Sequence, residues 1–148
     1  MKKLLGLVFL MLILISAAKL TSLKPQNELS IEGTWELINR YNYDGLNVSD
    51  TIQNTNGYRQ IKMFHEGRVM WTRFSPDDPV EWFGYGRYKS TGDQLEESLE
   101  YGSDAMMKVI DTTVVFMFEL QLDEDNYSQF TLDEEGNRIF AENYKRIR

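Results

Sequence analysis

Gly33-Thr34-Trp35-Glu36-Leu37-Ile38 is the stretch that decides the fold, because a glycine and then an aromatic residue in a β-rich run is how a small antiparallel barrel begins. Glycine tolerates a backbone bend at this point, and the large apolar area of the indole plugs a barrel end. The last strand carries Tyr144, Lys145 and Arg146, any of which reaches the indole if the first and last strands pair. Such pairing would close the sheet.

The rest of the chain predicts short strands joined by turns. Alternating apolar and polar residues between Gly, Pro, Asn and Asp clusters indicate antiparallel strands in up-and-down order. We therefore predict an all-β, eight-stranded antiparallel up-and-down barrel. The predicted strands are 33–43, 58–65, 68–74, 81–89, 94–101, 114–122, 127–132 and 138–147.

Two connections leave alternatives open. Residues 44–57 form a polar segment of about fourteen residues, which is longer than most connections and is either a lid or a plain solvated loop. Residues 103–110 are either a single helical turn capped by Ser103 or a plain loop.

The hairpin around Glu66-Gly67 predicts a register in which Met63 lies opposite Met70. One face is the more apolar at its centre, and we assign it to the barrel interior; it collects Arg59, Ile61, Met63, Met70, Thr72 and Phe74.

The next hairpin, 81–101, has two candidate registers. A three-residue turn with a bulge sets Arg87 opposite Glu97, and we prefer it because it pairs the two charges. A two-residue turn would set Gly86 opposite Glu97. Gly84 and Gly86 leave a smooth patch that a ring or another backbone can approach closely.

The first eighteen residues have the composition of a secretory signal peptide. Two lysines are followed by an apolar run at 4–15 and by small residues that allow cleavage after Ala18. The run is shorter than the roughly twenty residues of a membrane-spanning helix. Without cysteine, neither a bacterial lipid anchor nor a disulfide can form. We predict a secreted or periplasmic protein with no membrane span after cleavage: signal peptide at 1–18, flexible leader at 19–30 and β-barrel domain at 31–148.

Charge and reactive side chains argue against several function classes. The net charge is −7, and about −9 once the two lysines of the signal are removed, which disfavours nucleic acid as a partner. His65 is the single histidine and cysteine is absent, so we predict no metal site and no cofactor. Nucleophile motifs are missing, and we predict no enzymatic activity; Glu96, Glu97 and Glu100 are the carboxylates left for acid–base chemistry.

Three features together resemble the lipocalin-like β-barrels: Gly33-Thr34-Trp35, eight consecutive strands, and a basic residue after the terminal aromatic. A closer resemblance is to small secreted lipocalin-like proteins of Bacteroidetes-type bacteria, through Gly86-Arg87-Tyr88-Lys89 with the strand that follows and through Glu142-Asn143-Tyr144-Lys145-Arg146. The resemblance implies a barrel over 31–148 in which Trp35 and Arg146 form a structural pair.

The predicted function is binding of a small apolar or amphipathic molecule in the barrel interior. The candidate ligand-binding residues are Arg59, Met70, Phe74, Arg87, Glu97, Phe116, Phe118 and Tyr144. One alternative is a barrel filled by its aromatic side chains, which acts as a structural module or binds a protein partner through its outer face. A third hypothesis is a carboxylate-dependent enzyme that uses Glu97.

Overall fold

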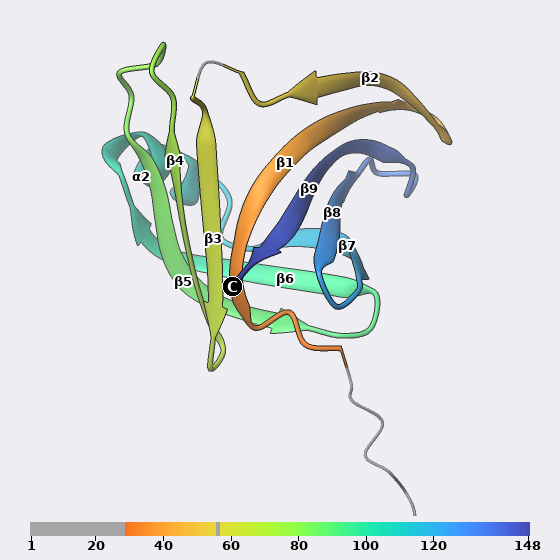
Figure 1. Ribbon diagram of the computed structural model, residues 1–148. Coiled ribbons are helices and arrows are strands. Elements are labelled where there is room, and N and C mark those ends of the chain that lie inside the picture. The colour runs from red at the N-terminus through yellow and green to blue at the C-terminus, as the bar shows by residue number, and fades with distance from the viewer. Residues whose placement is uncertain (1–28, 56) are drawn as a thin grey trace, which may run out of the picture.

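The computed structural model of the protein describes residues 29–55 and 57–148, so the predicted signal peptide and most of the predicted leader lie outside the described residues. In this part of the chain, nine strands form one antiparallel sheet and one short helix packs beside it (Figure 1). The elements are β1 Gly33–Asp44, β2 Asn47–Gln53, β3 Arg59–His65, β4 Arg68–Phe74, β5 Trp82–Ser90, β6 Gln94–Gly102, α2 Asp104–Ile110, β7 Phe116–Leu122, β8 Asn126–Leu132 and β9 Arg138–Ile147.

The sheet closes on itself because β1 pairs with both β3 and β9. The long β1–β9 ladder runs from Thr34 opposite Ile147 to Asn42 opposite Phe140, with one bulge between Leu37 and Asn39. Figure 1 shows β9 curving alongside β1 over this length. The result is a ring of eight strands, β1 and β3 to β9, which confirms the predicted closure of an up-and-down antiparallel sheet.

The segment predicted to be a polar loop contains a ninth strand instead. β2 turns back through Gly45, whose φ of 63° suits a tight turn, and pairs with the distal half of β1. It fits there because β1 pairs with β3 only from Gly33 to Glu36 and then diverges from it. All β2 side chains except Ile52 are exposed, so no apolar alternation marked this strand in the sequence.

The β3–β4 hairpin has the predicted register, with Met63 opposite Met70. Its inward face was predicted wrongly. Lys62 and Phe64 are buried, whereas Met63 and Met70 are 38% and 43% exposed. The prediction assumed that the more apolar face is the inner one. In this barrel the inner face of the hairpin carries Gln60, Lys62 and Trp71 to the cavity, and Met63 and Met70 lie on the outer face.

The β5–β6 hairpin adopts neither predicted register. A bulge after Tyr85 sets Gly86 opposite Leu99 and Tyr88 opposite Glu97, and Arg87 forms its ion pair with Glu100 at 3.0 Å. A Cβ on Gly86 would lie 2.1 Å from the carbonyl oxygen of Ser98. Backbone approaches this position closely, as the glycine pattern predicted.

One end of the ring is closed by a packed aromatic core. Trp35 is fully buried, its indole Nε1 donates to the carbonyl oxygen of Ile31 at 2.7 Å, and Tyr127 packs edge-on at 4.9 Å between ring centroids. Phe64 and Tyr144 pack on Tyr127 from other sides.

Helix α2 lies against β5 and β6. Ser103 caps it by accepting a hydrogen bond from the Met106 amide at 3.3 Å, and Met106 is buried. Of the two alternatives for residues 103–110, the helical one is therefore confirmed. β7 begins at Phe116, later than predicted, and Val114 before it is 69% exposed.

Arg146 covers the plugged end from outside. Its guanidinium carbon lies 4.0 Å from the Trp35 ring centroid, and its nitrogens donate to the carbonyl oxygens of Ser30, Glu32 and Glu124. This group therefore fastens the segment before β1 and the β7–β8 turn to the last strand.

We expect Arg146→Ala to lower the free energy of unfolding by about 1–3 kcal/mol, because hydrogen bonds from a charged donor are lost together with the cover of the indole. Arg148→Ala is the matched control: that side chain is 71% exposed and pairs only with surface carboxylates, so we expect a change of about 0–1 kcal/mol. Denaturant melts measure both, and equal losses would contradict the role given to Arg146.

Candidate ligand-binding site

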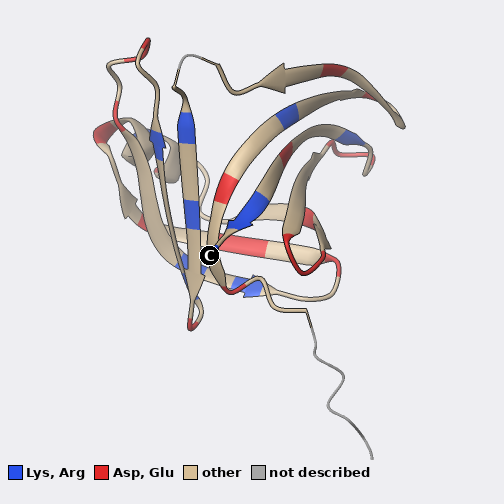
Figure 2. Ribbon diagram, viewed as in Figure 1, with Lys and Arg blue, Asp and Glu red and all other residues tan. Residues whose placement is uncertain are grey.

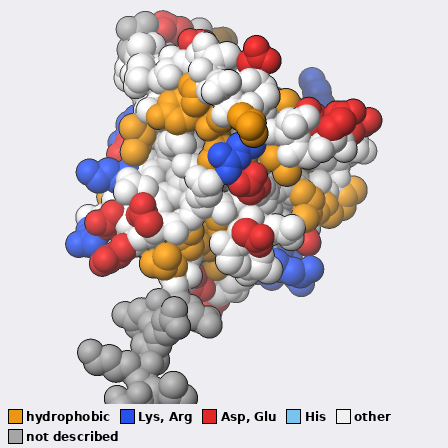
Figure 3. Space-filling model, turned by 90° about the vertical axis from the view of Figure 1, so that its right-hand side faces the viewer, with side chains coloured by type: hydrophobic (Ala, Val, Ile, Leu, Met, Phe, Trp, Pro, Cys, Tyr) orange, Lys and Arg blue, Asp and Glu red, His pale blue; other side chains and the backbone are white. Residues whose placement is uncertain are grey.

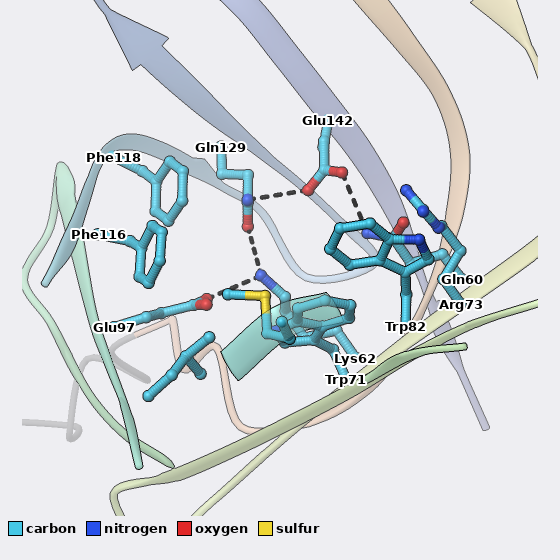
Figure 4. Close-up of a pocket in the computed structure, with 12 residues that line it drawn as sticks. Gln60, Lys62, Trp71, Arg73, Trp82, Glu97, Phe116, Phe118, Gln129 and Glu142 are labelled. Carbon is cyan, nitrogen blue, oxygen red and sulfur yellow. Dashed lines mark hydrogen bonds and ion pairs between the residues drawn. The ribbon is translucent and has the colours of Figure 1, made fainter. Parts of the chain in front are cut away.

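A cavity of about 220 Å³ lies inside the ring, beyond the aromatic plug. Strands β3 to β9 and helix α2 all contribute to its wall (Figure 4). The lining residues are Gln60, Lys62, Trp71, Arg73, Trp82, Glu97, Leu99, Met106, Phe116, Phe118, Gln129 and Glu142.

The side walls of the cavity are apolar and largely aromatic. Figure 4 shows Phe116 and Phe118 of β7 on one side and Trp71 and Trp82 on the other. Trp71 lies against Gly84, where an added Cβ would be 2.9 Å from the indole Nε1. The glycine thus makes room for the indole, and the faces of these rings are suited to packing against another flat apolar group.

A buried ion pair forms the polar side of the cavity. The Lys62 ammonium donates to Glu97 Oε1 at 2.8 Å and to Gln129 Oε1 at 2.9 Å, and the Lys62 and Glu97 side chains are each only 4% exposed. The Phe64, Phe118 and Tyr144 rings surround the ammonium at 5.7–5.8 Å from their centroids. Burying two charges is tolerated here because each compensates the other and the ammonium also has a hydrogen bond to Gln129.

The ion pair continues into a network around Glu142. Gln129 Nε2 and the Tyr144 hydroxyl donate to Glu142 Oε2 at 2.9 and 2.8 Å, and Gln60 Nε2 donates to Oε1 at 3.0 Å. The Tyr58 hydroxyl in turn donates to Gln60 Oε1 at 2.8 Å. Both amide side chains are therefore held in one orientation, with their donors and acceptors already engaged.

Burial fixes the protonation of the tyrosine in this network. The pKa of Tyr144 is raised well above its ordinary value, first by burial and then by the negative charge of Glu142. The hydroxyl of Tyr144 therefore keeps its proton at physiological pH and remains a donor to the carboxylate. Burial first, and then the negative charges of Glu97 and Glu142, raise the pKa of its stacked neighbour Tyr127.

The predicted site residues divide into two groups. Glu97, Phe116 and Phe118 line the cavity, and Tyr144 lies fully buried beside it. The other four do not face the interior: Arg59, Met70, Phe74 and Arg87 lie on the outer face, and the predicted interior pair of Arg87 with Glu97 does not form. These four placements were wrong because the inner face of β3 and β4 and the β5–β6 register were predicted wrongly.

Sequence analysis missed Lys62, Trp71 and Gln129 as cavity residues. Lys62 and Trp71 were placed on the outer face of the hairpin because the opposite face is the more apolar at its centre. The glycine at position 84 was the available signal for Trp71, since it predicted the close approach of a ring. Nothing in the local pattern marks Gln129, which is buried in the middle of β8.

Other kinds of site find little support in the described residues. No group of three or more His, Cys, Asp or Glu side chains placed to hold a metal ion occurs in 29–55 or 57–148. No helix within the same ranges is long and apolar enough to cross a membrane. Acidic residues gather at several hairpin turns instead, as Figure 2 shows.

Comparison with known proteins finds similarity in structure. No family model matches the chain, and no curated protein matches it. A lipocalin-like protein from Bacteroides uniformis ATCC 8492 superposes with a TM-score of 0.53 at 15% identity, over 78% of this chain and 97% of that one. An uncharacterized protein from Bacteroides eggerthii DSM 20697 superposes with a TM-score of 0.52, also at 15% identity, over 80% of this chain and 100% of that one. At this identity the likeness concerns the fold, and the chain folds as a lipocalin-like antiparallel β-barrel.

Proposed function

We propose that the protein binds a small amphipathic molecule inside the ring. The observation that carries this proposal is the cavity of about 220 Å³, in which aromatic walls meet a buried polar network. Concave, mostly apolar sites with a few fixed polar groups are the usual form of small-molecule sites. The lipocalin-like fold supports the proposal, because closed eight-stranded rings leave room for one small ligand.

We also propose that binding takes place outside the cytoplasm. The support is the composition of residues 1–18, a positive start and an apolar run followed by small residues.

The alternative of a filled barrel is less well supported. Phe116 and Phe118 line the cavity and leave it open, while Met70 and Phe74, which were predicted to face the interior, lie outside. On the face drawn in Figure 3, apolar side chains lie in several groups separated by charged and polar ones. Both observations favour the interior over this face as the functional surface.

We expect protein isolated from its host to carry a small molecule that native mass spectrometry detects. Phe116→Trp enlarges a side chain inside the cavity and should lower occupancy by about tenfold or more, the equivalent of 1.4 kcal/mol. Phe83→Trp makes the same change at a side chain that is 37% exposed and does not line this cavity, so occupancy should stay as in the parent.

The neutral two-ring dye 6-propionyl-2-(dimethylamino)naphthalene gives a second measurement in solution. Its fluorescence should rise with the parent and with Phe83→Trp, and much less with Phe116→Trp. If no molecule co-purifies and the dye does not bind, the proposed function is wrong and the filled-barrel alternative takes its place.

A further inference from the structure

We propose that the cavity selects neutral molecules of one or two aromatic rings that carry a hydroxyl or amide group, and that it discriminates against carboxylates and ammonium ions. This inference rests on the proposed function, because it names the ligand class of the same cavity.

The first argument is the charge balance of the cavity wall. Two cations, Lys62 and Arg73, and two carboxylates, Glu97 and Glu142, line it. Lys62 is neutralised by Glu97 within the barrel, and Arg73 lies over the Trp82 ring at 4.6 Å and reaches Asp78 at 3.7 Å. The Glu142 carboxylate is engaged by hydrogen bonds from Gln60, Gln129 and Tyr144. The charges of the wall are thus already engaged, so a charged ligand would lose hydration without gaining a free counter-charge, which is costly.

The second argument is the hydrogen-bonding capacity that remains. The network around Glu142 is already hydrogen-bonded internally: Gln60, Gln129 and Glu142 form hydrogen bonds with one another and with neighbouring tyrosines. The Lys62 ammonium has three N–H donors, of which two are used by Glu97 and Gln129. Among the described residues, Glu97 accepts from Lys62 through Oε1, which leaves Oε2 as an acceptor for a ligand.

One hydroxyl group satisfies both of these atoms. Its O–H donates to Glu97 Oε2 while its oxygen accepts the third N–H of Lys62. A primary or secondary amide does the same with its N–H and C=O. A carboxylate ligand has no donor for Glu97 and is repelled by it. An ammonium ligand has no acceptor for Lys62 and is repelled by it, so in each case one protein group stays unpaired.

The third argument is size and shape. An apolar cavity of about 150 Å³ holds one benzene molecule. The cavity here has a volume of about 220 Å³, which is more than that volume but less than twice as large. One ring or two fused rings therefore fit it better than a long chain. Trp71, Trp82, Phe116 and Phe118 surround this space, and aromatic rings pack favourably on them face-to-face or edge-on.

A matched series of naphthalene derivatives tests the inference by calorimetry near neutral pH. The neutral probe is 2-naphthol, the anion is 2-naphthoate and the cation is 2-naphthylmethylammonium. We expect 2-naphthol to bind the parent protein at least about tenfold more tightly than either ion, the factor that corresponds to one lost charged contact.

Glu97→Gln should reverse this order for the anion. The substitution keeps the shape of the side chain and leaves the Lys62 ammonium without its counter-ion, so 2-naphthoate should overtake 2-naphthol. Arg87→Gln is the control: Arg87 is an exposed residue of the neighbouring strand β5, paired with Glu100, and its loss should leave the order unchanged.

The outcomes separate this inference from the proposed function. If 2-naphthoate binds the parent as tightly as 2-naphthol, the inference is wrong and the proposed function stands. If none of the three binds while another molecule co-purifies from the host, the ligand class is wrong in size or shape. If Glu97→Gln does not fold, the series on the parent protein still decides the question.

Discussion

Trp35→Ala is expected to lower the free energy of unfolding by about 3–5 kcal/mol, the loss typical of removing a large aromatic side chain from a packed core. The Trp35 side chain is fully buried and packs on Tyr127 beneath the guanidinium of Arg146. Its removal empties the plug of the barrel and leaves the carbonyl oxygen of Ile31 without its donor. A loss of this size is a large part of the total stability of about 5–15 kcal/mol of an ordinary domain.

Trp82→Ala is the control for this prediction, since Trp82 is only half-buried at the cavity wall, where Arg73 lies over its ring. Urea melts of the parent and both variants, followed by circular dichroism, compare the two losses. If Trp82→Ala lowers the free energy of unfolding as much as Trp35→Ala does, the aromatic core at the closed end does not have the stabilising role given to it.

Lys62→Met is expected to cost about 3–5 kcal/mol, because it leaves the Glu97 carboxylate in the barrel interior without its cation. Methionine fills much of the volume of lysine, so lost packing contributes little. The orphaned acceptor on Gln129 adds to the cost.

The double variant Lys62→Met, Glu97→Met separates charge from packing. Replacing both members of a buried pair by apolar side chains of similar volume is often close to neutral, so the double variant should be more stable than Lys62→Met alone. The same urea melts measure this. A double variant no more stable than Lys62→Met would mean that the two residues do not compensate each other in the folded protein.

The closure of the barrel was predictable from sequence because it depends on two residues that can be recognised in the sequence, a tryptophan and an arginine. A buried tryptophan lies near the start of the first strand and an arginine near the end of the last, and their contact requires the two strands to pair. The β3–β4 register followed from a two-residue turn in the same way. β2 was not predictable, because a strand with exposed side chains on both faces carries no alternation.

The site was only partly predictable, and the reason is again physical. Phe116 and Phe118 were found because apolar residues alternate along β7. Glu97 was chosen for a pair with Arg87 that does not form, and it lines the cavity all the same. Lys62 was missed because its burial depends on Glu97 and Gln129, which are 35 and 67 residues away in the chain. A pattern within one hairpin cannot show that its lysine meets a carboxylate from another, so the more apolar face was placed inside.

The ninth strand gives the molecule two regions of unequal resistance to opening. β2 contributes no buried side chain and holds to the sheet through the far half of β1 alone, whereas β1 stays bound to β9 along most of its length. Detaching β2 therefore breaks a few backbone hydrogen bonds and leaves the ring and its cavity whole. Opening the β1–β9 ladder exposes the core. Amide hydrogens of β2 should accordingly exchange with solvent through local fluctuations, and those shared by β1 and β9 only when the whole protein unfolds.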